Sequence, residues 1–537
     1  MSRYVVGVDV GTGSVRAALF DLRGSLLETA KQDIHTYSEH GIRFEQSSEE
    51  IWKAVCKAVR TVISDTNIDK TEVIGIGFDA TCSLVVVTED GQPLPVGEHG
   101  IGERNIIVWM DHRATDQAER INETGHAVLD YVGGRISPEM ETPKLLWLRE
   151  NLSTIFDSAG HFFDLTDYLT WRATGSLARS ICTTVCKWTY LAHEQRWDES
   201  YFRQIGLSEL ADEGFARIGQ EIVEPGTALS QGLTAKSAAE LGLSVGTAVP
   251  AGLIDAHAGG IATVGALRDD NVSNPEACLA YVFGTSACTM TTTAAPVNVP
   301  GVWGPYYSAM IPGLWLNEAG QSAAGAGMSH LVTFHPAYAE AKCLAQEQAM
   351  NIMSWLAEQA NSKCATSSAT VFLAEGVHVV PEFMGNRAPF ADPNARALIA
   401  GLDMDDSLDS LLALYIAGVC GLGYGLRQII EAQASQGIKI DTIVISGGAG
   451  QDELVRQLIA DSTQLEVVAP ETSEPVILGA SMLAAVAAGA YGSIELAMKF
   501  MSTFGARYEP GEGRVREIHQ KRYKAFELLQ NAGREIQ

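Results

Sequence analysis

A carboxylate stands inside an apolar run near the start of the chain, directly before a glycine turn that carries hydroxyl groups. The acid is Asp9 in VVGVDV, residues 5–10, and the turn is Gly11-Thr12-Gly13, followed by Ser14. An acid inside an apolar strand is costly unless a cation or hydrogen bonds compensate it. Carboxylate oxygens bind Mg²⁺, so we interpret Asp9 as a metal ligand, directly or through water. The alternative is an acid capped by backbone N–H groups.

A second carboxylate lies in VPAGLIDAHAGG, residues 249–260. We predict a strand that ends at Gly252 and a helix opened by Asp255, His257 and two glycines. A helix N-terminus favours the ionised form of an acid, and an ionised Asp in a cleft can accept a proton from a substrate hydroxyl. The alternative is that Asp255 is only the N-cap of the helix. His257 is interpreted as structural.

Three glycine-rich turns each follow an apolar strand, at Gly11, at Gly284-Thr285-Ser286 and at Ser446-Gly447-Gly448-Ala449. Backbone N–H groups in such turns point toward a common spot and can cradle a phosphate. The motif G-x-x-x-x-G-K-[ST] is absent. A dinucleotide motif is excluded as well, because Arg16 replaces its third glycine and a strand follows where that motif needs a helix. Each turn taken alone is also compatible with an ordinary hairpin or strand–helix connection.

The elements that must position these residues follow a mixed α/β pattern. Apolar periodicity predicts strands over 4–10, 15–21, 25–30 and 73–79 and a helix over 47–60. Ser47 and Glu50 have the spacing of a capping box at the start of that helix.

The second half of the chain repeats this plan. Residues 278–293 are again an apolar run, a turn with hydroxyl groups and a β-branched run, which suggests a duplicated fold. A helix is predicted over 408–432 with Gly437 as its terminator, and a strand, glycine loop and helix over 438–461. We place the boundary within 260–275, before Asp269 and Asp270, which gives domains of residues 1–268 and 269–537.

Composition restricts the class of protein. A chain of 537 residues is too long for one hydrophobic core. Its net charge of -27 argues against a nucleic-acid-binding surface and against docking on an anionic membrane. No run of about 18 apolar residues appears, so we expect no transmembrane span, and because the first residues lack the charged and apolar regions of a signal peptide, we expect none.

The nine cysteines are scattered, which is typical of reduced thiols in the cytoplasm. Cys182-x-x-x-Cys186 is the one close pair. Because no second Cys/His pair stands at ligand spacing, a structural zinc site is not expected.

The ordered set of motifs resembles the FGGY family of carbohydrate kinases. The motifs are Asp9-x-Gly11-Thr12-x-Ser14-x-Arg16, Gly252-x-x-Asp255-x-His257-Ala258-Gly259, Phe283-Gly284-Thr285-Ser286 and Ser446-Gly447-Gly448-Ala449. The resemblance covers essentially the whole chain. It implies an α/β fold of two duplicated ribonuclease-H-like (actin-like ATPase) domains around a central cleft.

The resemblance also implies ATP and Mg²⁺ as cofactors, with Asp9 near the metal and Asp255 as the general base. The residues that it places at the nucleotide are Thr12, Gly13, Ser14, Arg16, Gly284, Thr285, Ser286, Gly447, Gly448 and Ala449.

The segments GFDATCS (77–83) and VWMDHRA (108–114) resemble the ribulokinase side of the family. They imply sugar contacts from Asp79, from Trp109 as a wall and from Asp111 as a hydroxyl acceptor. Lys187 and Glu318 match two further sugar positions, and Asp255 completes the set. Without the resemblance, Asp111, Lys187 and Glu318 would be interpreted as a solvated face.

D-ribulose is the first choice among the ketopentoses. METPKLLWLREN (140–151) departs from the family's Lys-x-x-Trp phrase although it contains Lys144 and Trp147, and segments 90–105 and 196–225 match no subgroup. The alternatives are a kinase of xylulose, L-ribulose or a pentitol, or a nucleotide-dependent sugar-binding or regulatory protein without turnover, in which Asp255 would have no purpose. The expected partner is a small-molecule sugar, and a homodimer is implied by the family alone.

Overall fold

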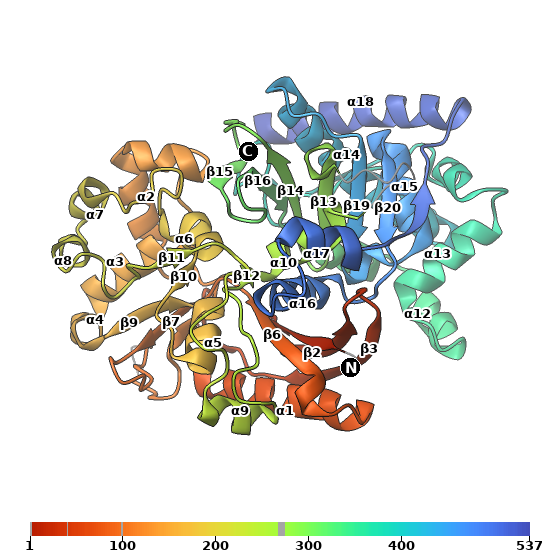
Figure 1. Cartoon of the computed structure of the whole chain (residues 1–537). Coiled ribbons are helices and arrows are strands. Elements are labelled where there is room, and N and C mark those ends of the chain that lie inside the picture. Colours follow the sequence, from red (N-terminus) through yellow and green to blue (C-terminus); the bar gives the residue numbers. More distant parts are fainter. Residues whose placement is uncertain (1–2, 40, 98–99, 267–273, 537) are drawn as a thin grey trace.

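Two mixed β-sheets, one in each half of the chain, form the centre of the molecule (Figure 1). The structure is a computed structural model that describes residues 3–39, 41–97, 100–266 and 274–536. The predicted domain boundary, with Asp269 and Asp270, lies outside the described residues.

The first sheet has the strand order β12-β6-β1-β2-β3. The strands β1, β2 and β3 are antiparallel neighbours, whereas β6 and β12 run parallel to β1. Helix α1 (Ser48–Thr66) contacts β2 and β3 through its apolar side. The strand bounds are β1 Tyr4–Val10, β2 Ser14–Asp21, β3 Leu26–Asp33, β6 Val73–Ala80 and β12 Leu253–Ile254.

The second sheet repeats this topology. Its order is β15-β16-β14-β13-β19-β20-β21, and the five middle strands have the same order and directions as the first sheet. The predicted duplication is therefore confirmed, with one added strand at each edge. The bounds are β13 Cys278–Phe283, β14 Ala287–Thr293, β15 Trp303–Tyr307, β16 Trp315–Gln321, β19 Thr442–Ser446, β20 Glu466–Pro470 and β21 Phe504–Tyr508.

Local sequence signals located most of the predicted elements. Ser47 Oγ accepts the hydrogen bond of the Glu50 N–H, as the capping box requires. The Glu50 carboxylate does not return to Ser47 but accepts from the His35 backbone N–H. The strand expected to end at Gly252 is instead β12, which follows that glycine and leads directly into α10 (Asp255–Val264).

A third sheet, which the sequence did not predict, is inserted in the first half. Its order is β4-β5-β8-β7-β9, with short strands separated by long loops. The bounds are β4 Tyr37–Glu39, β5 Arg43–Gln46, β7 Leu84–Val87, β8 Ile106–Ile107 and β9 His161–Asp164. The helices in the same half are α2 Thr115–Glu123, α3 Glu141–Asn151, α4 Ser153–Ser158, α5 Leu165–Thr174, α6 Ile181–Trp188, α7 Glu199–Ile205, α8 Ser208–Asp212 and α9 Ala235–Leu241, beside the strand pair β10 Arg179–Ser180 and β11 Ile222–Val223.

One helix of the second half, α14 (Leu408–Ser435), is long and apolar enough by composition to cross a membrane. It packs against α11 and α15 and is mostly buried, as expected of a core helix. It ends before Gly437, as predicted. The other elements are α11 Gly325–Thr333, α12 Tyr338–Glu347, α13 Ile352–Ser362, β17 His378–Val380, β18 Leu398–Ala400, α15 Glu453–Thr463, α16 Pro475–Ala487, α17 Ile494–Met501 and α18 Arg514–Glu535.

The two halves interlock through one helix from each. Helix α16 belongs to the second half but packs on β1 and β6 of the first sheet, and α10 of the first half packs on α16 and β13 (Figure 1). Glycines permit these close approaches. A Cβ added to Gly77 would lie 2.0 Å from the Ala480 carbonyl oxygen, and one added to Gly479 would lie 2.0 Å from that of Ala258.

We expect Gly77→Ala to destabilise the protein by about 1–3 kcal/mol, because the added methyl group overpacks the contact between α16 and the first sheet. Scanning calorimetry should show a lower melting temperature. Gly102→Ala is the control, because an added Cβ there meets no atom within 4 Å. Equal melting temperatures for the two variants would show that the helix shifts without cost.

Candidate active site

A cavity of about 460 Å³ lies where the two halves meet. Both carboxylates that the sequence singled out, Asp9 and Asp255, line it. The cavity therefore brings together the two acids from separate segments, as predicted. The other predicted residues that line it are Thr12, Arg16, Trp109, Lys187, Gly284, Thr285, Ser286, Glu318, Gly447 and Gly448.

Two helices begin at this cavity. Ile254, Asp255 and Ala256 line it at the start of α10, and Glu474, Pro475 and Val476 line it at the start of α16. The N-terminus of a helix carries partial positive charge and unsatisfied N–H groups. Together with the glycine turns, the two helix ends make this region suitable for an anion.

A larger cavity of about 1000 Å³ adjoins the first. The two share Gly284, Thr285, Gly448 and Gln451 in their linings. The larger cavity is lined largely by apolar side chains, among them Met328, Met353, Tyr415, Val419 and Ala449. A ligand with an apolar ring system at one end and anionic groups at the other would fit the pair of cavities.

Thr12 connects the first glycine turn to the inserted sheet. The indole N–H of Trp109 donates to Thr12 Oγ1 at 3.0 Å, and Gln46 Nε2 donates to the Thr12 carbonyl at 2.8 Å. Gly13 and Ser14 line neither cavity. The Gly13 carbonyl accepts from the Ile34 N–H and the Ser14 carbonyl accepts from the Gly11 N–H, so their carbonyls close the turn, and their contact with the nucleotide stays a prediction.

Asp255 is the first residue of α10 and not its cap, because the N-cap position is Ile254. The carboxylate accepts a hydrogen bond from the Ala256 N–H at 2.6 Å. Burial, and then the neighbouring charge of Asp9, raise the pKa of Asp255 to about 6. The group is therefore ionised at neutral pH and basic enough to take a proton.

Asp9 lies on β1 opposite Arg16 of β2. Arg16 donates to Asp9 through Nε at 3.0 Å and also through Nη2, while its Nη1 donates to Glu474 at 2.6 Å. This ion pair links the first turn to the start of α16. The positive charge of Arg16 thus compensates the buried Asp9 carboxylate, and the sequence did not indicate this ion pair.

Asp79 lies beside Asp9 on the neighbouring strand but does not line the cavity, which corrects its predicted contact with a sugar. It is fully buried, and neither carboxylate oxygen has a hydrogen-bond partner. Burial, and then repulsion from Asp9 and Asp255, raise its pKa well above the usual value. A hard divalent cation would relieve this excess of carboxylates, so the donor set fits Mg²⁺.

Cations and a carboxylate also line the cavity near the indole ring of Trp303. Lys187 Nζ lies 5.4 Å from the centre of the Trp303 ring, and Arg387 Cζ lies 5.3 Å from it. Burial opposes ionisation of Glu318, yet Lys187 and His257 lower its pKa to about 2. This part of the cavity is thus rich in charged hydrogen-bonding groups.

Sequence reasoning missed Glu139, Trp303, Arg387 and Glu474, which all line this cavity. None of them belongs to a motif that the sequence analysis identified. No local signal separates them from ordinary surface residues, because their position depends on contacts between distant segments.

Asp111 lies outside both linings, and its predicted role as a hydroxyl acceptor is corrected. Both of its oxygens bond Arg113, at 2.8 Å to Nε and 2.8 Å to Nη2, and Oδ2 also accepts from the Phe44 N–H. The carboxylate is fully buried in this structural pair. Lys144 likewise forms a buried pair with Glu141 at 3.3 Å, and neither residue lines the cavity.

Comparisons with known proteins identify the family of the chain. The N-terminal domain model of the FGGY family of carbohydrate kinases matches residues 4–262, and the C-terminal domain model matches residues 279–488. The chain is 45% identical over 530 residues to the FGGY carbohydrate kinase domain-containing protein of Homo sapiens, which covers 98% of this chain and 95% of that protein. It is 38% identical over 519 residues to a D-ribulokinase of Saccharomyces cerevisiae, covering 90% of this chain and 72% of that protein.

Among solved structures, the ligand-bound xylulose kinase from Lactobacillus acidophilus superposes with a TM-score of 0.80 at 19% identity, covering 99% of this chain and 98% of that chain. This likeness concerns the fold. The prediction of two duplicated actin-like ATPase domains is confirmed.

Proposed function

Because the chain belongs to the FGGY family of carbohydrate kinases, we propose that this sugar kinase phosphorylates the terminal hydroxyl of a ketopentose, with D-ribulose preferred. The observation that carries the proposal is one cavity in which Asp255 faces both the glycine turns and the cluster of Lys187 and Glu318. The yeast relative is named a D-ribulokinase, which favours D-ribulose. An acyclic pentulose presents several hydroxyl groups, which suit charged donors and acceptors.

Asp255 acts as the general base. In phosphoryl transfer the protein mainly positions the reactants and neutralises charge. The Asp255 carboxylate orients the acceptor hydroxyl and takes its proton as the oxygen attacks the γ-phosphorus of ATP, while the bond from that phosphorus to the bridging oxygen breaks and ADP leaves. Thr12, Thr285 and the backbone N–H groups of the turns hold the phosphate oxygens, aided by the N-termini of α10 and α16.

Asp9 would hold Mg²⁺, with Asp79 behind it in a supporting position. The metal, when bound, supplies positive charge that offsets the charge developing on the phosphates. Arg16, which bonds Asp9 and Glu474 together, keeps the Asp9 carboxylate at the edge of the cavity.

The adenosine part of ATP would occupy the larger cavity next to Ala449 and Tyr415. The shared residues Gly284, Thr285 and Gly448 then lie at the passage between nucleoside and phosphates. Closure of the two halves on each other would exclude water from the phosphoryl group. We also propose a cytoplasmic location, which the nine free cysteines support, and a homodimer remains a prediction.

A coupled ADP-release assay over pentuloses and pentitols tests the substrate. We expect D-ribulose to give the highest kcat/KM, and an analogue that lacks one bound hydroxyl to react about 10⁴-fold more slowly. Chelation of Mg²⁺ should abolish turnover. If xylulose, L-ribulose or a pentitol gives a higher kcat/KM, that sugar and not D-ribulose is the substrate. If no sugar of the panel causes ADP release, a regulatory protein without turnover is favoured.

A further inference from the structure

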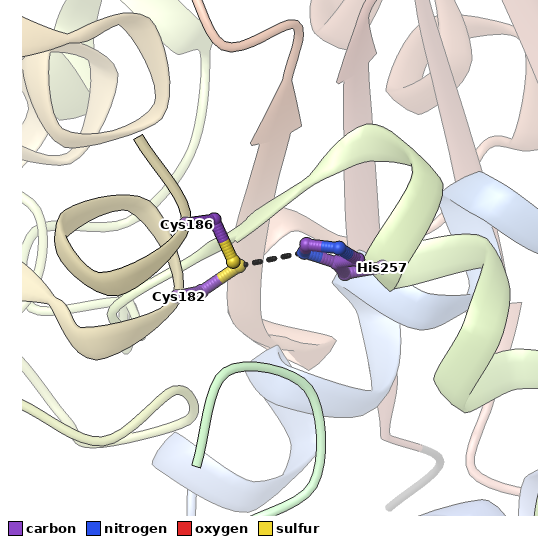
Figure 2. Close-up of side chains that lie close together, drawn as sticks. All are labelled: Cys182, Cys186 and His257. Atoms are coloured by element: carbon purple, nitrogen blue, oxygen red, sulfur yellow. Dashed lines mark hydrogen bonds between the residues drawn. The ribbon is translucent and has the colours of Figure 1, made fainter. Parts of the chain in front are cut away.

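Two thiols and an imidazole meet in the interior beside the sugar end of the cavity. Cys182 and Cys186 lie one turn apart on α6, and His257 lies in the first turn of α10 (Figure 2). All three side chains are buried, and Figure 2 shows both sulfur atoms directed toward the imidazole ring. Their ligand atoms lie within 4.8 Å of one another, which in the described part of the chain is true of no other group of three such residues.

The donor set matches a soft divalent cation. Zn²⁺ bonds Cys sulfur at about 2.3 Å and His nitrogen at about 2.0–2.1 Å, usually in a tetrahedron, which places donors about 3.5–3.8 Å apart. Cys182 Sγ and His257 Nδ1 are 3.0 Å apart, so small shifts of the side chains suffice to admit the ion. Two cysteines and one histidine would leave the fourth position to water.

The surroundings of His257 support metal binding independently of the three donors. The other ring nitrogen, Nε2, lies 3.2 Å from Glu318 Oε2. Histidines that ligate metals usually donate their second N–H to a carboxylate, which fixes the tautomer and directs the free nitrogen to the metal. On the opposite side, the Ile254 backbone N–H donates to Cys182 Sγ at 3.4 Å.

We propose that Cys182, Cys186 and His257 form a Zn²⁺ site whose occupancy orients Glu318 in the sugar pocket. Binding of Zn²⁺ to two thiolates and a neutral imidazole forms two Zn–S bonds and one Zn–N bond, and it releases two protons to solvent, one from Cys186 and one that Cys182 and His257 share. Glu318 lines the cavity with Lys187, and the metal reaches that carboxylate through the His257 ring. The effect on the sugar rests on the proposed function, whereas metal binding itself does not.

Zinc analysis of the full-length protein tests the site without sugar or nucleotide. After equilibration with Zn²⁺ under reducing conditions and dialysis, we expect one zinc per chain in the wild type and in Cys420→Ala. Cys420 is a buried, free cysteine on α14 and serves as the matched control. We expect no retained zinc in Cys186→Ala, and a zinc affinity about 10–100-fold weaker in Glu318→Gln, which removes the charge of the supporting carboxylate.

Cobalt binding by the wild type adds a measurement that requires no variant. Co²⁺ at this site should give the charge-transfer absorption of thiolate coordination, and Zn²⁺ should abolish it by competition. Absence of that absorption, or zinc retained equally by Cys186→Ala, would overturn the site. If the zinc-loaded and zinc-free proteins have the same KM for the pentulose, the zinc site stands but the proposal that it orients Glu318 is overturned.

Discussion

Asp255→Asn is expected to lower kcat for D-ribulose by about 10²–10⁴-fold, the usual contribution of a general base. The amide has the size of the carboxylate but cannot take a proton at neutral pH. Its oxygen can still accept the bond that the Ala256 N–H now gives to the carboxylate, so the start of α10 should persist. Steady-state kinetics measures the loss, and calorimetric titration should give an ADP affinity close to that of the wild type.

Asp69→Asn provides the control for this substitution. Asp69 caps a short helical turn on the surface by accepting from the Thr71 N–H, a task that asparagine performs equally well. It should leave both kcat and ADP affinity unchanged. Turnover within tenfold of the wild type in Asp255→Asn would refute the assignment of the base.

The difference between Asp255 and Asp111 shows where sequence reasoning fails. Asp111 is fully buried and Asp255 is partly exposed, and residue type alone does not distinguish their roles. Asp255 faces the cavity, whereas Asp111 is neutralised by Arg113 two residues later. The spacing Asp-x-Arg was available in the sequence, but in a loop it does not fix whether the side chains turn toward each other.

Elements defined by neighbouring residues could be predicted, and elements defined by distant partners could not. The hairpins at Gly11 and Gly284 follow from local turn chemistry. Strands such as β8 (Ile106–Ile107) have two residues and no alternating pattern, so only their pairing with β5 and β7 defines them. The contact between His257 and Cys182 could not be predicted for the same reason, because it joins two helices that are far apart in the sequence.

Duplication explains why the site forms at the interface. Each sheet presents its first hairpin at the same position in the topology, so the turns at Gly11 and Gly284 both reach one cavity. The exchange of α10 and α16 then places one helix N-terminus from each half beside these turns. Either half alone supplies only part of the anion-binding groups.

Lys187→Met is expected to lower kcat/KM for the pentulose by about 30- to 5,000-fold, the range for removing a charge that compensates another buried charge. Burial opposes the charged form of Lys187, yet the neighbouring Cys82 thiol and the Glu318 carboxylate raise its pKa well above the usual value, and at neutral pH Glu318 is the ionised one of the two. The lysine is therefore positively charged. Without it, Glu318 keeps its charge with less compensation in a buried pocket, and the sugar loses a cationic donor. ADP affinity should not change.

Two companion variants separate charge from packing. Lys144→Met removes a lysine that is equally buried and paired with Glu141, but outside the cavity, so it should lower stability while the KM for the pentulose remains unchanged. The double variant Lys187→Met/Glu318→Gln removes both charges together and should recover part of the activity lost by Lys187→Met, because no uncompensated carboxylate remains. If Lys187→Met and Lys144→Met reduce kcat/KM equally, the loss reflects general destabilisation and the role of Lys187 in sugar binding is wrong.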